Sequence, residues 1–369
     1  MIQTAILGGG PAGAYCAYCL AKKDVYPVIF DHSHPREKAC GGLVSPLTQE
    51  LFPFINRLPV EHSVRNRIFF ISPSGKQICC RLKKGKLVGF SRSEFDQYLV
   101  NMAIDKGAKL INEKVIAIER KNNLWKVKTR KQSYMIKMLV GADGVNSLAR
   151  KKIMGPLDKR DKGLCFGYFV KGIENKEITM KLLPQGEGYI WVVPRVQQTS
   201  VGIGCADISD FHGRRMELDT FIAQHYPNVE KISRYAALIP NVKNVKTFNR
   251  PLAGDNWILI GDAAGHVNSL WGEGILYAIL DGELAAQAIV ENKSRLFDTL
   301  WKKAYGRSLF TSIKLRRWLR KKYILEFFCY CLKYWSIIEL APFHSWANQR
   351  MKRVVEGYRK QFNLPQFCE

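Results

Sequence analysis

Glycines near the start of the chain have the spacing of a phosphate-binding turn. An apolar run over residues 2–7 leads into Gly8-x-Gly10-x-x-Gly13, and small residues follow, which predicts a strand, a tight turn and a helix. The positive N-terminus of such a helix binds a pyrophosphate through its backbone N–H groups. Asp31 follows the next apolar run, where an acidic residue that binds ribose hydroxyls is expected. This part of the chain therefore predicts a dinucleotide site.

A second group of residues typical of nucleotide sites lies far downstream. A buried strand over residues 257–260 runs into a Gly-Asp motif over residues 261–265, in which Asp262 can accept hydrogen bonds from sugar-like hydroxyls. Gly274 and Ile275 then open an amphipathic helix, whose first amides form an electropositive position for an electron-rich ring edge. We expect the Gly-Asp motif and the helix start at Gly274 to build one site together with the glycine turn near the start of the chain.

Three further segments are candidates for the site. The two glycines of Cys40-Gly41-Gly42 allow close approach to a flat ligand, although a plain turn is the alternative. Arg92 stands at the start of a predicted helix, where it can bind a phosphate or nucleotide or simply be solvated. Tyr189 and Trp191 share one face of a predicted strand, and this periodicity favours core packing over an apolar cavity above a cofactor ring.

Composition indicates a globular protein with anionic partners. The chain has 369 residues, of which 47% are hydrophobic, and a net charge of +25, which favours nucleic acid, an anionic membrane surface or phosphorylated substrates. Ten cysteines lack a paired framework, and Met1 leads directly into the first strand, so we expect reduced thiols in the cytosol. No cysteine cluster has zinc-site spacing, so no metal site is expected, and no uncharged apolar run is long enough to span a bilayer.

The hydrophobic patterns predict an α/β fold (α+β overall). A discontinuous Rossmann-like nucleotide domain is expected over residues 1–160 and 245–295, with an inserted antiparallel-sheet substrate domain over residues 161–244. Strands near residues 67–90 are candidates to join that sheet. Residues 296–369 predict a basic helical region, either a packed cap with a solvated face or a surface that rests on anionic lipid. Nucleic acid is a weaker third interpretation, because no nucleic-acid-binding module is present.

Taken together, these motifs resemble the geranylgeranyl reductase family of FAD-dependent oxidoreductases, within the p-hydroxybenzoate-hydroxylase-like superfamily. The resemblance covers about residues 1–295. It rests on Gly8–Gly13, Asp31, Lys38-Ala39-Cys40-Gly41-Gly42, Arg92-x-x-Phe95-Asp96, Gly141-Ala142-Asp143-Gly144, Tyr189-x-Trp191 with Pro194, Gly261–Gly265 and Gly274-Ile275. The Cys-Gly-Gly loop and the Tyr-x-Trp segment point to the reductases, whereas the other motifs are common to the superfamily. One departure is Asp31, where FAD proteins more often carry Glu.

The resemblance implies a set of FAD-binding residues. They are Gly8, Gly10, Pro11, Ala12, Gly13, Asp31, Cys40, Gly41, Gly42, Leu43, Arg92, Val115, Asp262, Gly274 and Ile275. We assign Tyr189, Trp191 and Trp271 to a substrate cavity. Cys40 is the candidate catalytic residue, with water or the flavin itself as alternative proton donors.

The activity that the resemblance implies is reduction of C=C bonds in a polyprenyl chain, on a lipid or a prenyl diphosphate. The electron donor would be NAD(P)H, ferredoxin or flavodoxin. The nearest alternative is a flavin monooxygenase that hydroxylates an aromatic or quinone-type substrate, and a third is a non-catalytic flavoprotein that binds membranes or nucleic acid. A halogenase would need Trp where Tyr189 stands. We expect a cytoplasmic monomer whose basic C-terminal region contacts the cytoplasmic face of a membrane, without nucleic acid as a partner.

Overall fold

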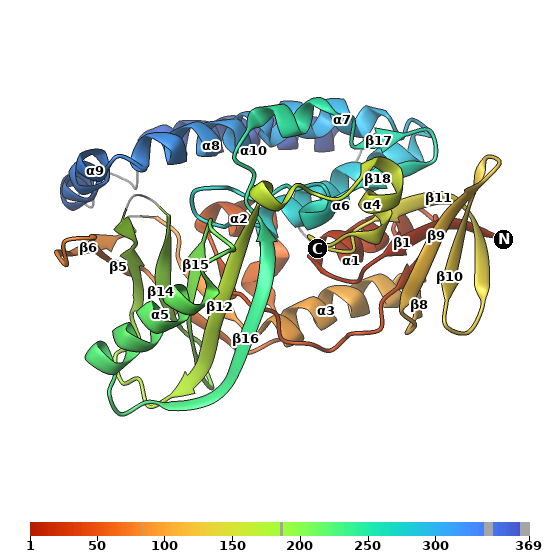
Figure 1. The fold of residues 1–369 in the computed structure, drawn as a ribbon. Helices are drawn as coiled ribbons and strands as arrows, with labels where there is room; N and C mark the ends of the chain where they lie inside the picture. Colours follow the sequence, from red (N-terminus) through yellow and green to blue (C-terminus); the bar gives the residue numbers. More distant parts are fainter. Residues whose placement is uncertain (83, 185–186, 336–341, 362–369) are drawn as a thin grey trace. The chain divides into compact units, whose positions relative to one another are not determined.

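The chain divides into two compact units in the computed structural model, which describes residues 1–82, 84–184, 187–335 and 342–361 (Figure 1). Unit 1 comprises Met1–Arg36, Ser93–Lys162 and Pro240–Phe310, and unit 2 comprises Glu37–Arg92, Gly163–Ile239 and Thr311–Glu369. Sequence patterns assign residues 37–66 to the nucleotide domain and leave the strands near residues 67–90 as candidates for the inserted sheet. In the structure residues 37–92 all belong to unit 2, and two strands of the 67–90 region pair into its large sheet. Residues 336–341 and 362–369 of the expected basic region lie outside the described residues.

Unit 1 is built on a mainly parallel sheet. Its strand order is β17 (Ala253–Gly254), β18 (Trp257–Leu259), β11 (Ser133–Gly141), β1 (Ile2–Leu7), β2 (Val28–Phe30) and β8 (Lys109–Ile111). Strands β18, β11, β1, β2 and β8 run parallel, and β10 (Leu124–Thr129) joins β11 to β9 (Val115–Lys121) by antiparallel pairing. The carboxyl ends of β1 and β2 therefore meet at one edge, which is the edge that binds ligands in such sheets.

Two helices of unit 1 pack unusually close together. They are α1 (Pro11–Ala21) and α6 (Ile275–Val290), and nearly all of their side chains are buried. A Cβ at Gly282 would lie 2.7 Å from the backbone oxygen of Ala12, so only glycine permits this approach. The remaining helices of unit 1 are α3 (Arg92–Asp105), which begins at the boundary of the unit, α4 (Leu148–Met154) and α7 (Leu296–Trp301). A π-helical turn, Lys302–Gly306, follows α7.

Unit 2 is built on a seven-stranded sheet. Its order is β16 (Glu230–Pro240), β12 (Lys162–Lys171), β15 (Thr199–Cys205), β14 (Gly188–Pro194), β13 (Ile178–Leu182), β5 (Arg67–Ile71) and β6 (Gln77–Arg81). Pairing is antiparallel along β12, β15, β14 and β13 and parallel between β13 and β5. One face of this sheet packs against α5 (Phe211–His225) through a core that includes Phe166, Ile190 and Phe221.

Unit 2 also contains a small sheet that follows the Cys-Gly-Gly loop, and most of the C-terminal helices. A three-stranded sheet has the order β3 (Leu43–Val44), β7 (Leu87–Phe90) and β4 (His62–Arg65), and α2 (Pro46–Leu51) follows β3. The C-terminal helices are α8 (Arg307–Leu319), α9 (Lys322–Trp335) and α10 (Pro342–Gln361). Within the described residues, no helix is both long enough and apolar enough to cross a membrane.

The predicted fold class is confirmed, with an α/β nucleotide-type domain, an antiparallel sheet and a helical C-terminal region. The sequence analysis did not predict β16. The first residues of that strand, Glu230–Arg234, are all exposed, so they lack the alternation of buried and exposed side chains by which a strand is recognised.

Candidate functional site

The glycine turn of unit 1 is closed on one side and open on the other. Gly8 has a φ of +102°, and its N–H donates to the Phe30 carbonyl across 2.9 Å. A Cβ at Gly13 would lie 2.0 Å from the Gly8 oxygen, so glycine is required where the helix packs on the strand. A Cβ at Gly10 would meet only Arg36 Nη2, at 4.0 Å, among the described residues. Arg36, which the sequence analysis did not select, therefore lies beside the open side of the turn.

Helix α1 begins at this open side without a side-chain cap. Gly10 is the N-cap residue, and it makes no side-chain capping hydrogen bond to the first turn of the helix. Backbone N–H groups at a helix start need acceptors, and phosphate oxygens supply them together with negative charge that matches the helix dipole. The turn therefore has the shape and the donors that a pyrophosphate requires.

Asp31 is bound to this turn as a carboxylate. Its Oδ2 accepts from the Gly9 N–H at 2.7 Å, and its Oδ1 accepts from the N–H and hydroxyl of Ser33 at 2.8 and 2.6 Å. Burial alone would raise the pKa of Asp31, but the His34 imidazole, whose Nε2 lies 3.5 Å from Oδ2, and hydrogen bonds from Ser33 and Gly9 outweigh it and hold the pKa well below its usual range. Asp31 thus fixes the glycine turn to the end of β2, and it can accept a further hydrogen bond as an anion.

The Gly-Asp motif lies beside the glycine turn in unit 1. A Cβ at Gly261 would lie 2.9 Å from Ala12 Cβ, and a Cβ at Gly274 would lie 3.8 Å from Asp262 Oδ1. Gly274 is the N-cap of α6, again without a side-chain cap. The packing of α1 against α6 thus brings two uncapped helix starts and Asp262 into one region, although more than 200 residues separate them in sequence.

The other predicted site residues are divided between the units. Val115 begins β9 in unit 1. Trp271 is also in unit 1, and its backbone N–H donates to Asn268 Oδ1 across 3.1 Å. The predicted residues of unit 2 are Cys40, Gly41, Gly42, Leu43, Arg92, Tyr189 and Trp191. Trp271 is therefore placed in a different unit from the two aromatic residues with which it was grouped.

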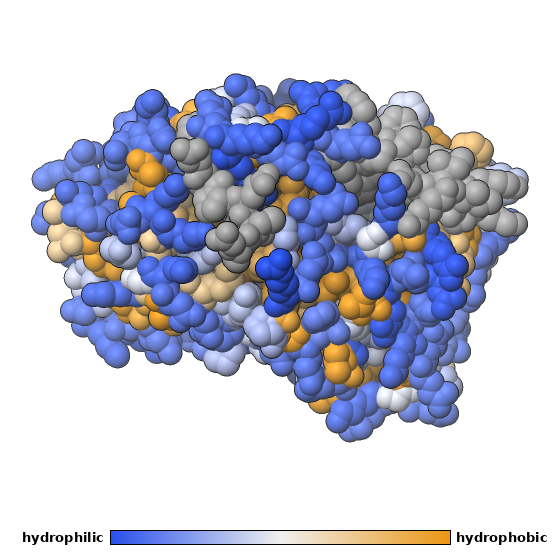
Figure 2. All heavy atoms as spheres, turned by 180° about the vertical axis from the view of Figure 1, so that it is seen from behind, coloured by the Kyte–Doolittle hydropathy of each residue, from blue (hydrophilic) through white to orange (hydrophobic). Residues whose placement is uncertain are grey.

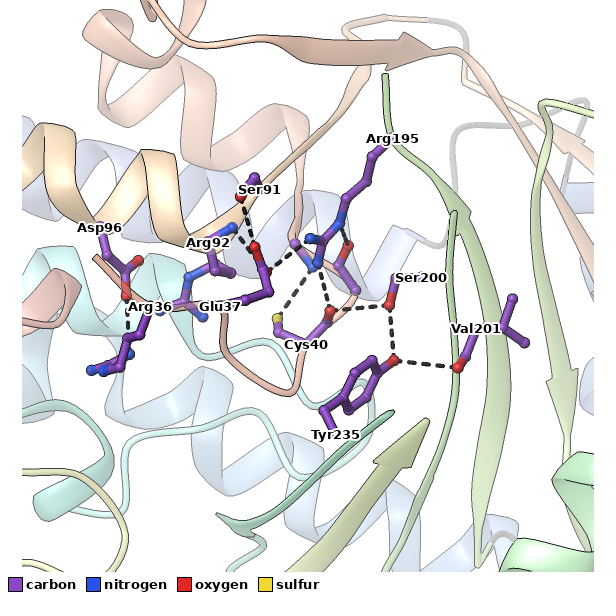
Figure 3. A network of polar contacts seen from close by, with 12 residues as sticks. Arg36, Glu37, Cys40, Ser91, Arg92, Asp96, Arg195, Ser200, Val201 and Tyr235 are labelled. Carbon is purple, nitrogen blue, oxygen red and sulfur yellow. Dashed lines mark hydrogen bonds and ion pairs between the residues drawn. The ribbon is translucent and has the colours of Figure 1, made fainter. Parts of the chain in front are cut away.

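Arg195 holds the Cys-Gly-Gly loop of unit 2 in place, and the sequence analysis missed it. Its guanidinium donates to Glu37 Oε1 at 2.8 Å, to the Cys40 carbonyl at 2.9 Å and to the Gly41 carbonyl at 3.3 Å (Figure 3). Only 3% of its side chain is exposed. One planar group thus satisfies two loop carbonyls and a carboxylate, which a lysine cannot do. The only sequence signal is an arginine directly after the Tyr-x-Trp strand.

Glu37 joins this arginine to the start of α3. Its carboxylate accepts from the Ser91 hydroxyl at 2.6 Å and from the Arg92 N–H at 3.1 Å (Figure 3). Burial alone would raise the pKa of Glu37, but the charge of Arg195 and hydrogen bonds from Ser91, Arg195 and Arg92 lower it below its usual range. Glu37 is therefore an anion at neutral pH.

The same loop is fastened to the Tyr-x-Trp strand by Ser200. The Ser200 hydroxyl donates to the Cys40 carbonyl at 3.2 Å and accepts from Trp191 Nε1 at 3.1 Å. Tyr235 Oη lies 2.9 Å from the same hydroxyl (Figure 3). A Cβ at Gly41 would lie 3.3 Å from Val193 Cγ2, so the loop backbone rests directly on strand β14.

Paired glycines make room for this network in the sheet. Gly167 of β12 pairs with Gly202 of β15, and a Cβ at either position would lie 2.5–2.6 Å from Tyr235 Oη. Burial is the main cause that raises the pKa of Tyr235, so its hydroxyl remains protonated at neutral pH. Trp191 is buried, and its ring meets the half-buried Tyr189 edge to face with centroids 6.0 Å apart. Trp191 thus packs in the core as its periodicity predicts.

Cys40, the first residue of the Cys-Gly-Gly loop, has a half-buried thiol. Its Sγ accepts a hydrogen bond from the Gly42 N–H across 3.3 Å, and its carbonyl is bound by Arg195 and Ser200. The backbone of the loop is therefore fixed at Cys40 and directly after it. Such rigidity suits a residue that orients a reactant.

A buried network of polar side chains fixes the backbone of the Gly-Asp motif. Asp281 Oδ2 accepts from the Gly261 N–H at 2.7 Å and lies 2.8 Å from His266 Nδ1, and Asp281 Oδ1 accepts from the Tyr305 hydroxyl. All three side chains are fully or almost fully buried. Tyr305 reaches this position from the π-helical turn, a feature that is frequent at functional sites. One carboxylate thus fixes the backbone at the start of the Gly-Asp motif.

Asp281→Asn is expected to lower the free energy of unfolding by about 1–3 kcal/mol, because the amide cannot accept from every donor that faces Asp281. Urea denaturation followed by circular dichroism measures this loss. Asp105→Asn, which changes an exposed carboxylate, serves as the control and should change stability by less than about 0.5 kcal/mol. Equal stability of the two variants would contradict a supporting role for Asp281.

Comparisons with known proteins show where the chain is related. No family model matches it. It is 26% identical over 353 residues to a digeranylgeranylglycerophospholipid reductase of Methanocaldococcus jannaschii, and this alignment covers 86% of each chain. It is also 26% identical over 353 residues to a chloroplastic geranylgeranyl diphosphate reductase of Arabidopsis thaliana, which covers 87% of this chain and 70% of that protein.

Solved structures share the fold. A geranylgeranyl bacteriochlorophyll reductase-like protein of Thermoplasma acidophilum has a TM-score of 0.80 at 19% identity, over 98% of this chain and 99% of that one. The flavin-dependent brominase Bmp2 has a TM-score of 0.68 at 16% identity, over 98% and 99%. The resemblance drawn from the motifs is thereby confirmed: over most of its length the chain is homologous to proteins named as geranylgeranyl reductases.

Proposed function

We propose that this chain is an FAD-dependent reductase that saturates C=C bonds in a polyprenyl chain, carried by a lipid or a prenyl diphosphate. The observation that carries the proposal is the Cys-Gly-Gly loop fastened by Arg195 and Ser200 onto the Tyr-x-Trp strand (Figure 3). In the resemblance drawn from the sequence, these two segments are the ones that point to the reductases. Relatives named as reductases, which align with most of the chain, support it.

The residues of unit 1 fit FAD. Two helix starts without side-chain caps, at Gly10 and Gly274, offer backbone N–H groups, and Asp31 and Asp262 offer carboxylate oxygens for hydroxyls. We assign the pyrophosphate to the glycine turn, the adenosine ribose to Asp31 and the ribityl–pyrophosphate region to Asp262. The other predicted contacts, from Pro11, Ala12, Ile275, Val115, Arg92 and Cys40–Leu43, belong to the same proposal.

FAD, when bound and reduced by the electron donor, would supply the hydride for the reaction. An isolated alkene also needs a proton, so that each double bond gains two electrons and two protons in all. Cys40 is the candidate that orients the substrate or moves this proton, because its backbone is fixed while its thiol is half-buried. Tyr189, Trp191 and Trp271 are assigned to the apolar lining of the substrate site. Electrons come from NAD(P)H, ferredoxin or flavodoxin.

A prenyl tail partitions into a bilayer, so we also propose that the protein works at the cytoplasmic face of a membrane. A lipid or diphosphate head group would match the net charge of +25.

Mass spectrometry of lipid extracts tests the proposed reaction. Cells that express the chain should accumulate prenyl lipids that are heavier by two mass units for each saturated double bond, relative to cells without it. Cells that express an Asp262→Ala variant, in which a carboxylate of the proposed FAD site is removed, serve as the control and should resemble empty cells. Unchanged prenyl saturation, or new hydroxylated aromatic products, would contradict the reductase and favour the monooxygenase.

A further inference from the structure

Exposed cationic and aromatic side chains gather in unit 2 over the second half of α8, the turn at residues 320–321 and the exposed side of α9. The aromatic members are strongly exposed: Trp318 by 66%, Tyr323 by 86%, Phe327 by 67% and Tyr330 by 56%. The exposed cations of the same stretch are Lys314, Arg317, Arg320 and Lys321. Together with exposed Leu315, these residues are called the aromatic–cationic face. Among the described side chains between Lys314 and Tyr330, every exposed one is apolar or positively charged.

Packing on β6 determines which side of α9 is exposed. Leu325 and Cys329, one helical turn apart, are buried at 3% and 1% exposure. The Glu326 carboxylate accepts from the N–H and hydroxyl of Ser74, in the turn between β5 and β6, at 2.8 and 3.1 Å. The aromatic residues at 323, 327 and 330 follow the same helical spacing on another side, so α9 is apolar on both its packed and its exposed sides. Burial of the exposed side of α9 against a second apolar partner would therefore be favourable.

The charges on the face are not balanced locally. Within the part of the chain that the structure describes, no acidic side chain forms an ion pair with Lys314, Arg317, Arg320 or Lys321. The pKa of neighbouring Arg316 is lowered to about 10, mainly by burial and in addition by the positive charge of Arg320. The cations thus repel one another, and an anionic partner would relieve this repulsion.

Isolated hydrophobic residues elsewhere on the surface need no such partner. Figure 2 shows one side of the molecule, on which hydrophobic residues form small groups within a largely hydrophilic covering. Scattered exposure of this kind is usual in globular proteins. The aromatic–cationic face differs because bulky rings and cations occupy successive exposed positions of two consecutive helices.

We propose that the aromatic–cationic face binds the surface of an anionic lipid bilayer, with its rings inserted at the headgroup level and its cations against lipid phosphates. Aromatic residues and lysine or arginine together are the side chains that stabilise helices lying in a membrane interface. A second copy of this chain would bring the same positive charge to the face. An acidic protein would neutralise the cations but would not require four large rings exposed in water.

Vesicle sedimentation tests the proposal on the full chain, and it needs neither FAD turnover nor a prenyl substrate. Wild-type protein should sediment with phosphatidylglycerol–phosphatidylcholine vesicles and remain in solution with phosphatidylcholine alone. The triple variant Arg317→Gln, Arg320→Gln, Lys321→Gln should bind about 100-fold more weakly, at roughly fivefold for each cation. Its control, Lys128→Gln, Arg130→Gln, Lys137→Gln, removes the same charge from exposed positions of unit 1 and should bind within about threefold of wild type.

A second pair of variants separates insertion from charge attraction. Tyr323→Gln, Phe327→Gln, Tyr330→Gln should lose binding at least tenfold, whereas Ile104→Gln, Met216→Gln, Ile232→Gln, at exposed positions elsewhere, should not. Circular dichroism melting curves confirm that each variant is folded. Wild-type binding by both face variants, equal binding to neutral vesicles, or capture of an acidic ferredoxin without any vesicle binding would overturn the proposal. Failure of the reductase assay would leave this result unaffected.

Discussion

Gly10→Val is expected to give a folded protein that purifies without FAD. Gly10 has an extended backbone with φ −67° and ψ 179°, which valine adopts without strain. Its Cβ would meet only the end of the Arg36 side chain, at 4.0 Å, among the described residues. The valine methyl groups would instead occupy the space beside the first N–H groups of α1, where we place the pyrophosphate. Flavin absorbance of the purified protein and its circular dichroism spectrum measure the two outcomes.

Two other glycines provide controls for this variant. Gly13→Val should fail to fold stably, because its Cβ would lie 2.0 Å from the Gly8 oxygen. Gly357→Ala, in α10, should be yellow and stable, because no described atom lies within 4 Å of its Cβ position. A Gly10→Val protein with the full flavin content of wild type would show that the pyrophosphate does not bind at this turn.

Arg195→Leu is expected to retain FAD but to lose about 100-fold in reductase activity, because the Cys-Gly-Gly loop loses its main support. Two loop carbonyls and Glu37 lose their shared donor, and the buried ion pair is broken (Figure 3). Breaking such a pair costs about 3–5 kcal/mol of stability, since one charge stays buried without a partner. Flavin content, turnover of a prenyl substrate and urea denaturation measure the three effects.

Arg195→Lys and a double variant separate charge from geometry. The lysine keeps a positive charge near Glu37 but cannot bond to all three acceptors, so we expect stability to recover more than activity. Glu37→Gln combined with Arg195→Leu removes the unpaired charge and should likewise restore stability without restoring turnover. Full activity in Arg195→Leu would contradict the positioning role of Arg195.

The acid sensitivity of the protein follows from the same pair. Because the folded-state pKa of Glu37 is lowered, its contribution to stability is present above the unfolded-state pKa and is lost as pH falls through the folded-state value. Wild-type protein should therefore lose this stability only in acid. In Arg195→Leu the lowering is removed, so the difference in stability between the two proteins should shrink as pH falls below about 4.5.

Local backbone requirements made the nucleotide half of the site predictable. Gly8 and Gly13 are needed by the turn itself, Asp31 directly follows β2, and Asp262 lies three residues after the end of β18, so short segments of sequence carried these predictions. Arg195, Ser200 and Tyr235 act only after several strands have paired. Tyr235 of β16 reaches Ser200 because Gly167 of β12 and Gly202 of β15 leave space for its hydroxyl. No local sequence pattern indicates that these residues lie side by side.

The C-terminal region shows the same division between local and non-local information. Its sequence predicts basic, aromatic helices, but both a packed cap and a lipid-facing surface were consistent with that composition. Contacts of α9 with β6 and of Glu326 with Ser74 decide which of its residues are buried. The exposure of Tyr323, Phe327 and Tyr330 could not be read from periodicity alone, because apolar residues occur on every side of the helix.

The most direct test of the proposed activity is a reaction of the purified holoprotein with a defined prenyl substrate. The protein is reduced with dithionite under anaerobic conditions, mixed with digeranylgeranylglycerophospholipid or geranylgeranyl diphosphate, and the products are analysed by mass spectrometry. We predict products heavier by two mass units for each double bond reduced, formed without oxygen. Unchanged substrates in this assay, together with substrate-dependent oxygen consumption and a hydroxylated aromatic product in air, would contradict the account.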